Sequence, residues 1–217
     1  MHNSVVCANA PWAALQRLTD LGLWDCYLTA VPEQLSALTA LTRLILRGNE
    51  RLTSGWQHLL PLTQLQGLDL SWCNLTAVPE QVSALTALTR LDLSHSYELT
   101  GGWHHPLPLT RLLDLNLSSC GVTAVPQQLS ALTALTRLDL CDNNISSGWH
   151  HLLPLTGLAH LTLSRAPVPA ELATLLRLRI SYMPPFQPFA DHPEPWGLLF
   201  LLILWAICLA HAYGWLD

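Results

Sequence analysis

The chain has 217 residues, of which 50% are hydrophobic and only 12% are charged, and its net charge at pH 7 is −5. About a quarter of the residues of a typical globular domain are charged, so this chain is unusually apolar. Its acidic balance offers no overall attraction for nucleic acid, which we therefore exclude as an expected partner. The first residues, MHNSVVCANAPWAAL, lack a cationic region followed by an apolar run, so we expect no secretory signal peptide.

Residues 1–14 are predicted to form an N-terminal lead-in or partial cap. The terminal units of a stacked array need a polar outer face, whereas this segment carries the apolar side chains of Val5, Val6 and Trp12. We expect either that a partner covers this end or that the natural chain begins earlier.

Residues 15–166 repeat one leucine pattern at steps of 23 or 24 residues. The first leucine of each unit is Leu18, Leu41, Leu65, Leu88, Leu112, Leu135 or Leu158. The units follow Leu-x-x-Leu-x-Leu-x-x-(Asn/Cys)-x-Leu, which is the signature of leucine-rich repeats. The sequence therefore predicts an α/β repeat solenoid of seven repeats, a curved arc with a parallel sheet on its concave face.

Each unit is predicted to contain a short strand and a return segment on the convex side. The strand, x-Leu-x-Leu-x, has a period of two, so its leucines should point inward and its other residues toward solvent. The returns alternate between an odd type (Leu28–Leu41), in which Val31 enters the core, and an even type (Leu52–Leu65), in which Gly55 and Trp56 replace the valine and proline. The duplicated unit is thus a pair of repeats, about 47 residues long. We expect the indole to cover the space left by the missing valine.

One position after each strand predicts a ladder of small polar side chains. The position is occupied by Cys26, Asn49, Cys73, Ser96, Cys120, Asn143 and Ala166. Asparagine at such a turn satisfies backbone groups, and cysteine can replace it as a small buried donor. Alternate repeats lie ~10 Å apart, beyond disulfide reach, so we expect free buried thiols and a reducing compartment.

The C-terminal part divides into three predicted segments. Residues 167–182 are a degenerate terminal repeat or cap, and residues 183–195 are a proline-rich linker. Residues 196–216 contain no Asp, Glu, Lys or Arg and are a candidate transmembrane helix, since a bilayer needs ~20 apolar residues. The alternatives are an apolar capping helix or a wrongly predicted gene end. We expect a single-pass C-terminal membrane anchor with the repeats facing the cytosol, or otherwise a cytoplasmic protein.

The odd units, such as LTAVPEQLSALTALTRLDLS, resemble the 23-residue class of leucine-rich repeats. That class occurs in intracellular Ras-group proteins and in the repeat regions of plant disease-resistance proteins. The resemblance implies a solenoid that is not an enzyme and that binds proteins, small GTPases or signalling proteins among them. The chain departs from the class in its Gly-Trp returns, in its ladder cysteines and in the lack of an attached effector domain.

Columns of side chains from successive strands are expected to face solvent on the concave face. One column is Asp20, Arg43, Gly67, Arg90, Asp114, Arg137 and His160, and the next is Gly22, Ile45, Asp69, Asp92, Asn116, Asp139 and Thr162. Arginines beside aspartates on neighbouring strands should mostly pair with each other. Exposed Trp and Arg are enriched in binding sites, so the candidate binding residues are Trp24, Arg47, Trp72, His95 and Arg165.

No catalytic, cofactor-binding or metal-binding residues are predicted. The sequence has no phosphate-binding glycine loop and no nucleophile elbow. Paired histidines recur in alternate repeats, but a spacing of ~10 Å is too long for ligands that lie ~2.0–2.3 Å from zinc. We therefore predict a non-enzymatic protein-interaction module, a scaffold or adaptor tethered to a membrane. The alternatives are a receptor-like ectodomain with a missing N-terminus and a soluble regulator or inhibitor of a signalling enzyme.

Overall fold

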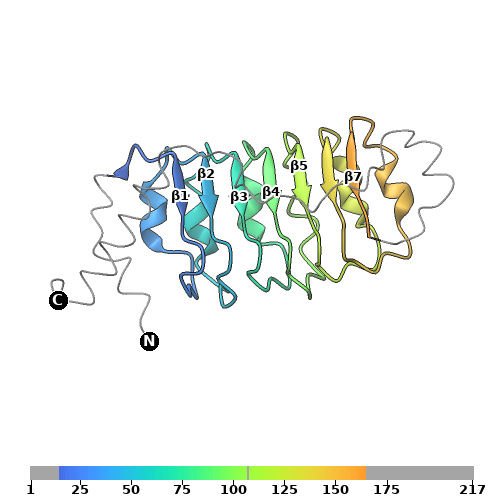
Figure 1. Cartoon of the computed structure of the whole chain (residues 1–217). Helices are drawn as coiled ribbons and strands as arrows, with labels where there is room; N and C mark the ends of the chain where they lie inside the picture. The colour runs from blue at the N-terminus through green and yellow to red at the C-terminus, as the bar shows by residue number, and fades with distance from the viewer. Residues whose placement is uncertain (1–14, 107, 165–217) are drawn as a thin grey trace.

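The repeats form one row of parallel strands in a computed structural model that describes residues 15–106 and 108–164 (Figure 1). The described residues contain a seven-stranded sheet in chain order, from β1 to β7, and all neighbours are parallel. The strands are β1 (Asp20–Gly22), β2 (Arg43–Ile45), β3 (Gly67–Asp69), β4 (Arg90–Asp92), β5 (Asp114–Asn116), β6 (Arg137–Asp139) and β7 (His160–Thr162). The predicted parallel sheet and its register are confirmed.

The core is the leucine spine behind this sheet. The middle residue of every strand is a leucine that pairs with the leucine of the next strand, as in Leu44 with Leu68. From β2 to β7 these leucines are at most 3% exposed. Each repeat buries its apolar face against its neighbours, because no single repeat is large enough to bury it alone.

The return segments contain short 3₁₀ helices, which corrects the α-helical part of the predicted fold class for the described residues. Odd returns contain η2 (Glu33–Ala37), η4 (Glu80–Ala84) and η5 (Gln127–Ala131), and even returns contain η3 (Trp56–Leu59) and η6 (Trp149–Leu152). Figure 1 places these helices behind the sheet. Runs of four or five residues suit the 3₁₀ form, which is used in short pieces with a rise of about 2.0 Å per residue.

The Gly-Trp pair of the even returns has a backbone cause. Gly55 has a φ of 77°, and a Cβ atom on it would lie 2.5 Å from the carbonyl oxygen of Val31 in the preceding repeat. Trp56 is partly buried against the core. Glycine is therefore required at this position, because the backbone is left-handed and lies against the backbone of the preceding repeat. The sequence-based interpretation explained Gly55 only by the space that it leaves for the indole.

Asparagine side chains join successive repeats, which confirms the predicted ladder. The Oδ1 atom of Asn49 accepts hydrogen bonds from the backbone N–H groups of Cys26 (3.1 Å) and Leu28 (2.9 Å). Its Nδ2 atom donates to the carbonyl oxygens of Leu23 (2.8 Å) and Leu46 (2.6 Å). Asn143 repeats this arrangement two repeat pairs further on.

Cys73 and Cys120, two of the ladder cysteines, are free thiols in the described part of the chain, as predicted. Cys73 and Cys120 are buried, whereas Cys26 is only half-buried. The thiol of Cys73 donates to the carbonyl oxygen of Leu46 at 3.3 Å, which replaces one contact of an asparagine. Burial raises the pKa of Cys73 and of Cys120 to about 12 in each case, so these thiols stay protonated at neutral pH.

Four predicted segments lie outside the described residues: the lead-in 1–14, the terminal repeat 167–182, the linker 183–195 and the apolar helix 196–216. Within residues 15–106 and 108–164, no helix has the length and apolar character needed to cross a bilayer.

Candidate functional site

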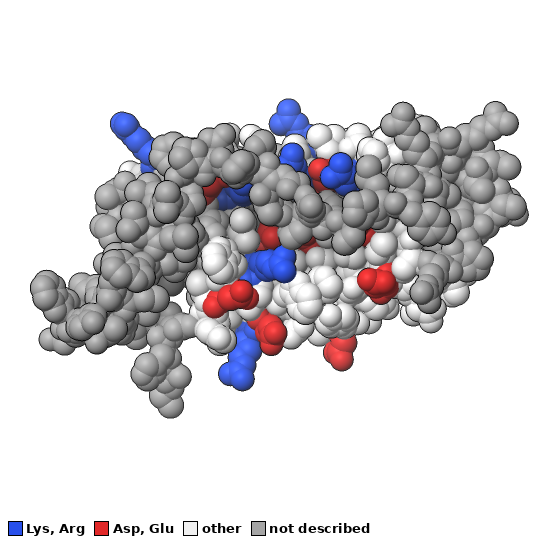
Figure 2. Space-filling model, in the orientation of Figure 1, with Lys and Arg blue, Asp and Glu red and all other residues white. Residues whose placement is uncertain are grey.

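The first column of the sheet face is a row of alternating charges. Arg43 lies 4.0 Å from Asp20, and Arg90 and Arg137 lie 3.5 and 4.0 Å from Asp114. The predicted pairing across strands is confirmed here. Figure 2 shows both signs of charge scattered over the visible face and not gathered into a single basic or acidic region.

The second column is buried from β3 to β6 and half-buried at Ile45 and Thr162, which corrects the expectation that it faces solvent. Asp69, Asp92, Asn116 and Asp139 are at most 3% exposed. The Oδ1 atom of each accepts a hydrogen bond of 2.8–3.0 Å from the backbone N–H group two residues later. These local bonds hold the side chain against the end of its own strand, where Asp and Asn favour such turns.

Asp92 is the most perturbed of these carboxyl groups. Its Oδ1 atom accepts from the Ser94 N–H group at 2.9 Å, and its Oδ2 atom accepts from the Asn116 Nδ2 group at 3.1 Å. Burial and the neighbouring Asp69 carboxylate raise the pKa of Asp92 to about 7, against the opposing effect of these hydrogen bonds. Burial also raises the pKa of Asp69. Asp92 therefore changes charge near neutral pH.

The residue that follows the strand by three positions has a left-handed backbone in repeat after repeat. The column is Asp25 (φ 53°), Gly48 (75°), Trp72 (58°), His95 (58°), Ser119 (54°) and Asp142 (52°). Gly and Asp tolerate this conformation, whereas for a bulky side chain it is a genuine outlier. Strained backbone of this kind costs about 1–3 kcal/mol per residue and clusters at binding and catalytic sites. Trp72 thus occupies a position that backbone energetics alone would not give it, whereas histidine is one of the residue types enriched in left-handed backbone.

Trp72, His95 and Tyr97 form an aromatic cluster on this face. The rings of Trp72 and His95 stack with centroids 3.9 Å apart and an angle of 14° between planes. Tyr97 packs its edge against both, with centroids 6.3 and 6.1 Å away, and its hydroxyl lies 3.3 Å from His95 Nδ1. Desolvation and the nearby Arg47 hold the pKa of His95 below its usual range, so the imidazole is neutral at pH 7.

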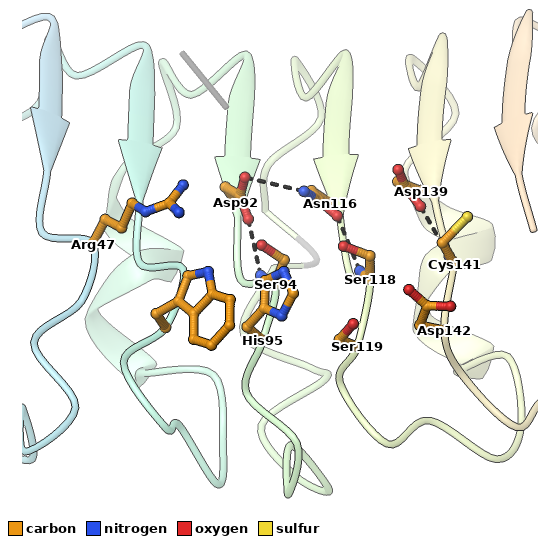
Figure 3. Close-up of a pocket in the computed structure, with 11 residues that line it drawn as sticks. Arg47, Asp92, Ser94, His95, Asn116, Ser118, Ser119, Asp139, Cys141 and Asp142 are labelled. Atoms are coloured by element: carbon orange, nitrogen blue, oxygen red, sulfur yellow. Dashed lines mark hydrogen bonds between the residues drawn. The ribbon is translucent and has the colours of Figure 1, made fainter. Parts of the chain in front are cut away.

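A pocket of about 240 Å³ lies beside the aromatic cluster (Figure 3). We call it the sheet-face pocket. It is hollow because small side chains, Ser94, Ser118 and Ser119, occupy its middle. The remaining lining residues are Arg47, Trp72, Asp92, His95, Asn116, Asp139, Cys141 and Asp142.

Three of the predicted binding residues, Arg47, Trp72 and His95, meet at this pocket. Trp24 is 43% exposed, but it does not line the pocket, and Arg165 lies outside the described residues. Arg47 differs from the first-column arginines, because no ion pair involves it within the described part of the chain.

Sequence reasoning missed the acidic part of the lining, which consists of Asp92, Asp139 and Asp142. The sequence signal that could have indicated the pocket was the set of small residues Ser94, Ser118 and Ser119, since small side chains in neighbouring columns leave a hollow.

Solved structures confirm the fold. The chain is similar to a leucine-rich-repeat protein of Leptospira interrogans, at 23% identity over 75% of this chain with a TM-score of 0.63. It is also similar to an internalin of Listeria monocytogenes, at 22% identity over 80% of this chain with a TM-score of 0.58. It spans 42% and 58% of the lengths of those two chains, or about half. No protein-family model matches the sequence, and no curated protein does. The chain has the leucine-rich-repeat fold that its sequence predicted.

Proposed function

We propose that this leucine-rich-repeat solenoid is a non-enzymatic protein-interaction module that binds a partner across its sheet face, around the sheet-face pocket. The observation that carries the proposal is the stacked pair Trp72 and His95, which holds two bulky rings in left-handed backbone beside that pocket. Binding sites, unlike cores, are where such strained positions cluster.

The chemistry of the face suits protein binding. Tryptophan and arginine are the side chains most enriched at the energetic centre of interfaces, and Trp72 and Arg47 line the same pocket. Seven strands ~4.8 Å apart give a face about 29 Å long, which can hold an extended segment or a helix of a partner. By resemblance to the Ras-group repeats, we propose a signalling protein, such as a small GTPase, as the class of partner.

The thiol beside the pocket supports a non-enzymatic role. Burial and the Asp139 carboxylate raise the pKa of Cys141 to about 12, so its thiolate is not available as a nucleophile at neutral pH. The Oδ1 atom of Asp139 accepts the backbone N–H group of Cys141 at 2.8 Å, so this oxygen serves a structural hydrogen bond.

A matched pair of photo-crosslinking positions tests the proposal. A photoreactive amino acid is placed at Ser118, in the pocket, or at Gln57, which is exposed on a return segment. We expect that a partner protein crosslinks to the photoreactive residue at position 118 and not to the one at position 57. The purified partner should bind the native chain but not the Trp72→Asn variant. Equal crosslinking from both positions, or unchanged binding by Trp72→Asn, would refute the proposal.

The membrane tether remains a separate proposal that rests on the sequence of residues 196–216, twenty-one residues without Asp, Glu, Lys or Arg. An anchor would concentrate the interaction face at a membrane, so that weak contacts gain effective concentration.

A further inference from the structure

We propose that the sheet-face pocket receives a single basic side chain, an arginine or a lysine, from the protein partner. This inference deepens the proposed function and rests on it. It names the group of the partner that the centre of the face would recognise.

The charges of the pocket are unequal. Among the described residues, Asp92, Asp139 and Asp142 line it together with one cation, Arg47. Figure 3 shows Arg47 at one side and Asp139 and Asp142 at the other, with His95 between them. Within the described residues the Asp142 carboxylate has no hydrogen bond and no ion pair. A cation on the Asp142 side thus meets the Asp142 carboxylate and stays away from Arg47, whereas an anion there would be repelled by that carboxylate.

The aromatic cluster supplies the second part of the recognition. The ring of His95 stacks on Trp72 on one side and lines the pocket next to Ser119 and Asp142. Because its pKa is lowered, the imidazole is uncharged at pH 7 and does not repel a cation. Cationic side chains favour aromatic faces within about 6 Å, and the planar guanidinium group also stacks on them.

The size of the pocket selects a side chain over a larger ligand. Its volume of about 240 Å³ lies below the ~300–1,000 Å³ of sites that bury a drug-sized molecule or a cofactor. The small residues Ser94, Ser118 and Ser119 form the hollow, and they offer hydroxyl and backbone groups that can accept from ammonium or guanidinium N–H groups.

The chain offers conservative variants for a test. Asp142→Asn keeps a residue that tolerates left-handed backbone. Asp25→Asn is the matched control, because Asp25 has the same backbone conformation (φ 53°) in the same column and does not line the pocket.

The experiment titrates the isotope-labelled full chain, in non-ionic detergent, with N-acetyl-arginine amide. The readout is the NMR shift of the Trp72 indole N–H group, assigned by its loss in Trp72→Asn. We expect saturable shifts with a dissociation constant on the order of 1 mM, as suits one side chain. We expect about threefold weaker binding by Asp142→Asn, the scale of a partly exposed charge pair, and no change in Asp25→Asn. The uncharged isostere N-acetyl-citrulline amide should not bind.

No saturable shift with the arginine probe, equal shifts with citrulline, or equal binding by the Asp142→Asn and Asp25→Asn variants would overturn the inference. The two proposals fail separately. Crosslinking from Ser118 without arginine binding refutes only the basic anchor. Arginine binding without any partner that contacts the sheet face refutes only the interaction module.

Discussion

The rings of Trp72 and His95 stack at 3.9 Å although each residue sits in left-handed backbone, with a φ of 58° in both cases. The equivalent positions in other repeats hold Asp25, Gly48 and Ser119. The two aromatic residues thus gain contact with each other, and Trp72 carries backbone strain of about 1–3 kcal/mol. Stability and recognition oppose each other at this site.

His95→Asn should change the free energy of unfolding by less than about 1.5 kcal/mol, because both residue types tolerate left-handed backbone and only the stacking contact of about 0.5–1.5 kcal/mol is lost. Partner binding should fall strongly at the same time. Urea unfolding and binding to a crosslinked partner provide the two measurements. A loss of stability above about 2 kcal/mol, the range of core truncations, would show that the pair is structural.

Gly55→Ala should destabilise the array by about 2 kcal/mol or more. The new Cβ atom would lie 2.5 Å from the Val31 carbonyl oxygen, at a residue whose φ is 77°. Gly157→Ala is the matched control, since its Cβ would meet the Leu135 oxygen at an ordinary 3.7 Å. Thermal unfolding followed by circular dichroism measures both variants. Equal melting temperatures for the two would contradict the backbone explanation of the Gly-Trp returns.

Asn49→Ala removes two acceptor and two donor contacts, three of which join the preceding repeat and one of which bonds Leu46 in the same repeat. Because the backbone groups left behind are buried, we expect a loss of about 2–4 kcal/mol in the free energy of unfolding. Asn144→Ala, at an exposed asparagine, should change it by less than about 0.5 kcal/mol. Urea unfolding compares the two. A small effect at Asn49 would mean that water can replace the ladder contacts.

The leucine spacing was enough to predict the strands, because one buried leucine per strand fixes the register of the sheet. Leu44, for example, pairs with Leu68, the equivalent leucine of the next repeat. It was not enough for the return segments. Whether four or five residues form an α- or a 3₁₀ helix depends on how the chain spans the gap between strands, which composition does not encode.

The candidate site was only half predictable. Arg47, Trp72 and His95 stand out as residue types, and they do meet at the pocket. Asp92 and Asp139 were assigned to an exposed column, because alternation along a strand predicts only which side of the sheet a residue takes. Their burial results from hydrogen bonds to Ser94 and Cys141, and this local turn geometry was not visible in the leucine pattern.

The proposed membrane anchor predicts that two double substitutions to arginine differ in their effect on membrane association. Leu202→Arg combined with Leu204→Arg should release the chain from membranes, since each arginine near the centre of a spanning helix costs about 2.5–3.5 kcal/mol. Gln187→Arg combined with Ala190→Arg, in the predicted linker, should leave the distribution unchanged. Alkaline carbonate extraction followed by centrifugation measures it. Full-length chain in the supernatant, or equal behaviour of both pairs, would contradict the anchor.

The Asp92 carboxyl group predicts a pH dependence of stability. Its pKa is about 7 in the folded state and 3.8 in the reference state, so between pH 4 and 7 the folded chain binds a proton that the unfolded chain has lost. The stability that this group contributes is therefore full below about pH 4 and is lost as the pH rises toward 7. Asp69 on β3 raises the pKa of Asp92, whereas Ser94 and Asn116 oppose that shift by hydrogen bonding.

Asp92→Asn removes this titration and keeps an acceptor for the Ser94 N–H group. The variant should therefore gain stability relative to the native chain as the pH rises from 5 to 8. Asp25→Asn, at an exposed carboxyl group, should keep a constant difference over the same interval. Urea midpoints at pH 5, 6, 7 and 8 measure this. A difference between Asp92→Asn and the native chain that stays flat, or that shrinks with pH, would show that Asp92 is already ionised in the folded state at pH 5, and that its hydrogen bonds outweigh burial and the Asp69 charge.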